Sequence, residues 1–269
     1  MKESSGRRRF LKWLGALGAA GGVVQVIPPA AAQSQSHQHA APPAPAKARA
    51  ARGAPAAKSQ VLAYLTAVEA EFVEAAVARL IPADELGPGA KEAGVAIFID
   101  RQLAGAWGTM ARNYRLGPWP EGTPQQGYQS PLTPQEVYRA AIRETNEFCL
   151  KIYSKPFNAL KAAQQDEVLR DLDEGKLALQ STRAQLFFNL LLGNTIEGFF
   201  SDPIYGGNRD KLGWKLVGFP GVAAVYTGFI DKHNVPYRVQ PVGIGDIQQK
   251  LAQVDEQGHA VHVLLTRKD

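Results

Sequence analysis

Cysteine is almost absent from this chain of 269 residues, which contains only Cys149, and histidine occurs five times. Haem attachment and iron–sulfur ligation need several cysteines, so the sequence excludes both groups as cofactors held by this chain alone. It also has no Gly-x-Ser-x-Gly motif and no glycine-rich loop with nucleotide-binding spacing. These absences argue against the common serine hydrolases and nucleotide-binding enzymes.

An excess of positive charge is also missing from most of the chain, although the net charge is +5. Residues 1–32 and 33–60 each carry +4, which leaves −3 for residues 61–269. The basic character therefore belongs to the first 60 residues, and the folded part is mildly acidic. This distribution removes the main support for nucleic-acid binding.

Residues 1–32 have the composition of an export signal. A basic start precedes an apolar run over 13–27, and a small-residue site at Ala30 and Ala32 predicts cleavage after Ala32. The run is shorter than the roughly 20 residues that cross a bilayer, and glycines interrupt it, so a permanent anchor is the weaker alternative.

The basic start resembles the twin-arginine consensus, with Gly6 where serine or threonine is usual. The matching residues are Arg7, Arg8, Phe10, Leu11 and Lys12. This resemblance implies export in the folded state by the twin-arginine translocase. An ordinary export signal with an accidental arginine cluster is the alternative.

Residues 33–60 are rich in alanine, proline, glutamine and serine, and they contain too few large apolar side chains to offset chain entropy. We expect a disordered linker. His37 and His39 lie in it and are better explained as solvated residues than as metal ligands.

Helical periodicity dominates residues 61–235 and predicts a mainly α fold, a compact helical domain with long ordered loops. Capping boxes begin two of the helices, at Thr66 and Thr133. The five helices expected are 66–80, 90–106, 134–153, 160–172 and 182–200.

The tail, 236–269, is expected to be a small mixed extension without an assigned role. The pattern from 222 onward predicts, in order, a short helix at 222–231, an extended segment at 237–242, a helix at 244–254 and a strand at 260–265. The pair His259 and His262 lacks an evident third ligand and is not predicted to bind metal.

The segment 197–221 combines glycines, aromatics and charges too densely for a regular element, and Pro203 ends the preceding helix near Ser201. We expect a long, ordered, non-repetitive loop whose aromatic residues pack on this protein or on a partner. Its charged residues are better explained as supports of tight turns than as catalytic groups. They are Asp202, Arg209, Asp210 and Lys211.

Several motifs together resemble the gluconate 2-dehydrogenase subunit 3 family over roughly residues 61–235. They are Leu80-Ile-Pro82, the loop 117–129 with Gly117-Pro-Trp-Pro-Glu-Gly-Thr123, Gly198-Phe-Phe-Ser-Asp-Pro203, Tyr205-Gly-Gly-Asn-Arg-Asp-Lys211 and Gly213-Trp-Lys-Leu-Val-Gly-Phe-Pro220.

The resemblance implies a non-catalytic small subunit of a periplasmic sugar or sugar-acid dehydrogenase, without a cofactor of its own. FAD is then expected in a large glucose–methanol–choline type subunit, and haem c in a multihaem cytochrome c subunit only in those complexes that have one. The small subunit would stabilise the flavoprotein, act as its export chaperone, and meet the membrane only through the complex.

Within that interpretation the loop is the candidate docking surface, with Tyr205, Arg209, Trp214 and Phe219 as contact residues. Cys149 is either buried or bonded to the large subunit through a disulfide. The alternative class is an independent periplasmic ligand-binding or hydrolytic protein with a site around Asp202, Arg209 and Trp214.

Overall fold

The computed structural model describes residues 61–120, 122–222, 229–235, 237–256 and 259–262. Over these residues the fold is mainly helical, with eight α-helices and only isolated β-bridges, which confirms the predicted fold class. The predictions for the leader and the linker concern residues 1–60, which lie outside the described residues.

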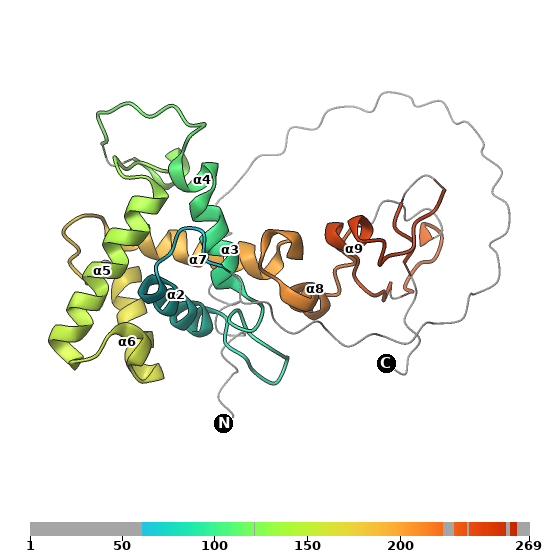
Figure 1. Ribbon diagram of the computed structural model, residues 1–269, viewed down its shortest axis with the longest axis horizontal. Helices are drawn as coiled ribbons and strands as arrows, with labels where there is room; N and C mark the ends of the chain where they lie inside the picture. Colours follow the sequence, from blue (N-terminus) through green and yellow to red (C-terminus); the bar gives the residue numbers. More distant parts are fainter. Residues whose placement is uncertain (1–60, 121, 223–228, 236, 257–258, 263–269) are drawn as a thin grey trace.

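All five predicted helices are present, and Figure 1 shows them packed as one body. They are α2 (Ala67–Leu80), α3 (Val95–Ala104), α5 (Pro134–Tyr153), α6 (Ala162–Asp173) and α7 (Ala184–Phe200). Both predicted capping boxes form: Thr66 and Glu69 begin α2, and Thr133 and Glu136 begin α5.

The second helix is shorter than expected. α3 begins only at Val95, because Gly94 adopts a left-handed conformation with φ of +74° and residues before it form turns. Gly105 is extended and separates α3 from the short helix α4 (Ala106–Thr109). Each glycine thus interrupts a pattern that periodicity alone reads as one helix.

Helix α7 lies at the centre of the body and packs against α2, α3, α5 and α6. Residues on several of its faces are buried, which explains why its sequence is apolar almost throughout. At Gly198 a Cβ atom would come within 2.8 Å of the Phe98 ring, so glycine is needed for the close approach of α3.

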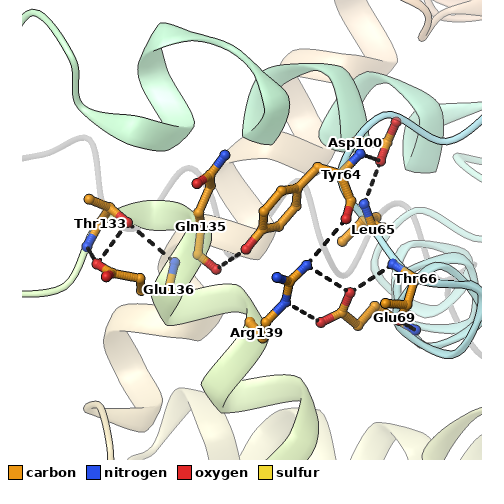
Figure 2. Close-up of polar contacts among 9 residues, drawn as sticks. All are labelled: Tyr64, Leu65, Thr66, Glu69, Asp100, Thr133, Gln135, Glu136 and Arg139. Atoms are coloured by element: carbon orange, nitrogen blue, oxygen red, sulfur yellow. Dashed lines mark hydrogen bonds and ion pairs between the residues drawn. The ribbon is translucent and has the colours of Figure 1, made fainter.

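A short segment before α2 is fastened to the body through Asp100 of α3 (Figure 2). The carboxylate of Asp100, which is 1% exposed, accepts backbone hydrogen bonds from Ala63, Tyr64 and Leu65 at 2.7–2.9 Å. Arg139 of α5 lies over the Tyr64 ring, 4.4 Å from its centroid. The first described residues are therefore fixed to the helical body.

Arg139 also joins α5 to the start of α2, because its Nε donates to Glu69 Oε1 at 2.9 Å. Burial raises the pKa of the Glu69 carboxyl, but hydrogen bonds from Arg139 and Thr66 outweigh it, and the net shift is downward. Glu69 is therefore both a helix cap and the buried partner of an ion pair.

The tail is less regular than its pattern predicted. Helix α9 (Ile244–Gln248) ends well before residue 254, and Lys250 adopts a left-handed conformation with φ of +57°. Ala260 makes an isolated bridge to Val254, and the rest of the expected strand, 263–265, lies outside the described residues, as do 223–228 of the expected helix at 222–231.

Candidate partner-docking surface

The loop after α7 folds back onto the carboxyl end of that helix. The indole Nε1 of Trp214 donates to the carbonyl of Phe200 at 2.7 Å, and Asn208 Nδ2 donates to the carbonyl of Ser201 at 2.7 Å. Asn208 Oδ1 also accepts from the Gly213 amide at 2.8 Å. Because the last carbonyls of a helix have no partner within it, these contacts brace the end of α7.

Two glycines allow this backbone to approach α7 so closely. A Cβ atom at Gly207 would lie 2.1 Å from the carbonyl oxygen of Gly198, and one at Gly213 would lie 2.0 Å from that of Phe199. No side chain fits at either distance. The glycines of this motif are therefore required because the backbone packs directly against the end of α7. We call residues 201–214 the brace.

The brace is more regular than expected. It contains turns of 3-10 helix at Pro203–Tyr205 and Arg209–Lys211, and it leads into helix α8 (Leu212–Val217). The prediction of an entirely non-repetitive segment is therefore wrong. The left-handed conformations of Asp210 and Lys211 turn the chain sharply enough to start α8, and Gly218, with φ of +70°, ends it.

The four predicted contact residues of this segment have different surroundings. Trp214 is 5% exposed and packs inside the protein, whereas Tyr205 and Phe219 are about half exposed at 50% and 47%. Arg209 has an exposed side chain, and its backbone N–H donates to Ala93 at 2.9 Å. Trp214 thus supports the surface from below, and the other three lie on it.

The exposed side of α8 adds two apolar residues that the sequence reasoning missed. Leu216 and Val217 are 37% and 60% exposed, and Phe219 follows them with its ring 5.3 Å from the Trp214 ring, edge to face. With residues 237–241 they line a groove of about 700 Å³. The available signal in the sequence was the pair of adjacent apolar residues shortly after Trp214. We call Leu216, Val217 and Phe219 the apolar rim.

Contacts of two carboxylates connect the tail to the brace. Asp202 Oδ1 accepts from the Ile204 amide at 3.0 Å, and its Oδ2 accepts from the Ile244 amide at 2.8 Å. Asp246 of α9 forms an ion pair with Lys211. These contacts agree with the structural interpretation of Asp202 and Lys211, because backbone amides occupy both oxygens of Asp202.

The alternative site around Asp202, Arg209 and Trp214 receives no support from this geometry. Asp202 lines a hollow next to α9, whereas Trp214 lines the groove beside α8. His259 bonds to Asp255 at 3.0 Å and His262 to the Val222 carbonyl at 3.1 Å.

Among the described residues no group of three potential metal ligands occurs. Nor is any helix in that part of the chain long and apolar enough to cross a membrane.

Cys149 lies on α5 and is fully buried. Burial raises the pKa of its thiol to about 11. Of the two alternatives for this residue, burial is the one that the structure shows. The sulfur of Cys149 is not exposed at the surface of this chain.

The fold and this surface define a class: a helical protein whose motif-rich segment braces a helix end and exposes apolar side chains beside it. The chain belongs to the gluconate 2-dehydrogenase subunit 3 family, whose sequence model matches residues 67–221. The match includes the brace and the apolar rim. Comparison with curated proteins and with solved structures returned no match.

Proposed function

We propose that this chain is the non-catalytic small subunit of a periplasmic FAD-dependent dehydrogenase of sugars or sugar acids. In this proposal the glucose–methanol–choline type large subunit holds FAD, and haem c belongs to a third subunit where one is present. The chain stabilises the flavoprotein and, through its own leader, carries it across the membrane at the twin-arginine translocase.

The observation that carries the proposal is the apolar rim on a motif shared with the subunit 3 family. Val217 projects from a short helix that Trp214 and the brace fix rigidly to α7. Apolar residues held in a fixed position lose little entropy on binding, so more of the free energy of burying them contributes to affinity. The brace therefore prepares the surface, and the rim makes the contact.

The docking experiment uses two valines of equal exposure. Val217 on α8 and Val68 on α2 are 60% and 62% exposed, so a change to aspartate removes the same apolar group at both positions. Val217→Asp should weaken co-purification of the flavoprotein by about tenfold or more, because a charge is buried unpaired, while Val68→Asp should not. If both variants retain the flavoprotein fully, the rim is not the docking surface.

The export experiment addresses the carrier function separately. Replacing Arg7 and Arg8 together with lysine should leave both this chain and its flavoprotein in the cytoplasm, because translocase recognition depends on the arginine pair. Fractionation followed by blotting for both chains provides the measurement. A flavoprotein that still reaches the periplasm would refute the carrier function without affecting the docking surface.

A further inference from the structure

The region between α3 and α5 has an unusual charge pattern. From residue 105 to residue 133 the only acidic residue is Glu121, while Arg112 and Arg115 give the segment a net charge of +1. The folded part of the chain is otherwise mildly acidic. A long segment almost without acids is therefore a local departure that needs an explanation.

This region also contains the most exposed aromatic side chain among the described residues. Tyr114 is 91% exposed, Leu116 is 73% exposed, and Trp107 of α4 is 38% exposed. Figure 1 shows the loop after α4 projecting beyond the ends of α4 and α5, away from the helical body. Arg112 lies on the same projecting stretch with an exposed side chain. We call residues 107–116 the tip.

The base of the loop holds the tip in place. Arg115 Nη2 donates to the backbone carbonyls of Ser130 and Pro131, and its guanidinium lies 5.6 Å from the centroid of the Trp119 ring. The Tyr128 hydroxyl donates to the Leu132 carbonyl at 2.6 Å. The tip is therefore presented on a braced base and needs little ordering before it meets a surface.

We propose that the tip binds the surface of an anionic bilayer. Tryptophan and tyrosine prefer the boundary between headgroups and acyl chains, a leucine beside them adds apolar burial, and a nearby cation is attracted to anionic headgroups. The tip supplies all of these on a projecting segment. This inference goes beyond the proposed function, in which other subunits alone bring the complex to the membrane.

The shape of the tip favours a bilayer over a protein partner. Anchor residues of protein interfaces fill matching pockets and are surrounded by contacts that exclude water. Here Tyr114 and Leu116 stand out from the body almost without contacts of their own, as their exposed fractions show. A fluid interface accommodates such side chains without a shaped counterpart.

The experiment measures insertion at the tip itself. Its background is the full chain with Trp13→Phe, because the leader carries a tryptophan of its own whose fluorescence would also be quenched. Trp107 and Trp119 then report on the loop, and Trp214 is buried. Vesicles of phosphatidylglycerol and phosphatidylcholine with brominated acyl chains should quench this fluorescence, and vesicles of phosphatidylcholine alone should quench it much less.

Two variants of the tip test the contributions. Tyr114→Ser with Leu116→Ser should raise the lipid concentration needed for half-maximal quenching by about tenfold or more, since two apolar groups are lost. Arg112→Gln should raise that concentration about fivefold, and only on anionic vesicles. The matched control is Leu150→Ser with Ile152→Ser on α5, which removes apolar residues that are 51% and 56% exposed and should have no effect.

Three results would overturn the proposal: no quenching on anionic vesicles, quenching that the tip variants leave unchanged, or equal loss in the α5 control. Co-purification with the flavoprotein is measured in parallel. If the tip variants abolish that association and leave quenching intact, the tip is a protein interface and not a membrane contact.

Discussion

Asn208 offers the sharpest test of how the brace is held together. Its side chain is fully buried, bonds to Ser201 and Gly213 at once, and sits on a left-handed backbone with φ of +46°. We predict that Asn208→Ala destabilises the chain strongly. Alanine removes both hydrogen bonds and adopts the left-handed conformation less readily than asparagine does.

The magnitude follows from these three losses. Each buried backbone group left without its partner costs roughly 1–3 kcal/mol, and alanine in the left-handed conformation adds about 1 kcal/mol. The free energy of unfolding should therefore fall by about 3–7 kcal/mol, a large part of the stability of an ordinary domain. Asn208→Gly removes the hydrogen bonds without the backbone strain and should be about 1 kcal/mol less destabilising.

Urea unfolding followed by tryptophan fluorescence measures both variants, because Trp214 is itself part of the brace. Asn113→Ala, a change of the same side chain at an exposed position, is the control and should remain within about 0.5 kcal/mol of the parent chain. A loss below about 1 kcal/mol for Asn208→Ala would refute the reasoning, and equal losses for alanine and glycine would refute the strain component.

Two further predictions concern groups with shifted pKa values. The pKa of Glu69 is lowered in the folded chain, so its ion pair with Arg139 stabilises the fold above its ordinary value of 4.5, and this stability is lost as pH falls through the lower folded value. Glu69→Gln keeps a capping side chain and should lower the free energy of unfolding by about 1–2 kcal/mol at pH 7. In urea titrations the difference in this free energy between the variant and the parent chain should vanish on acidification. A difference that stays constant with pH would contradict the prediction. Cys149, whose pKa is about 11, should react fully with a thiol reagent only in denaturant. Non-reducing electrophoresis should show no disulfide to a second chain. Rapid labelling of the folded chain would be inconsistent with the burial of this thiol.

The five long helices could be predicted from sequence because period and capping agree. The boxes at Thr66 and Thr133 mark helix starts through local hydrogen bonds, which a short stretch of sequence fully specifies. The break between α3 and α4 could not be predicted in the same way. Gly94 and Gly105 are compatible with a helix locally, and only packing against the rest of the domain selects their other conformations.

The orientation of the aromatic side chains in the loop after α7 could not be predicted from the sequence either. Sequence reasoning grouped Trp214 with Phe219 as contact residues, because a loop without a period gives no rule for which aromatic side chain faces inward. The direction is set by the backbone of Asp210 and Lys211, whose positive φ values turn α8 so that Trp214 bonds to the end of α7. The residue that looks most like an interface anchor is therefore part of the support. A loss of binding after Trp214→Ala would report collapse of the rim rather than loss of a contact, and Val217 is the position at which docking and folding can be separated.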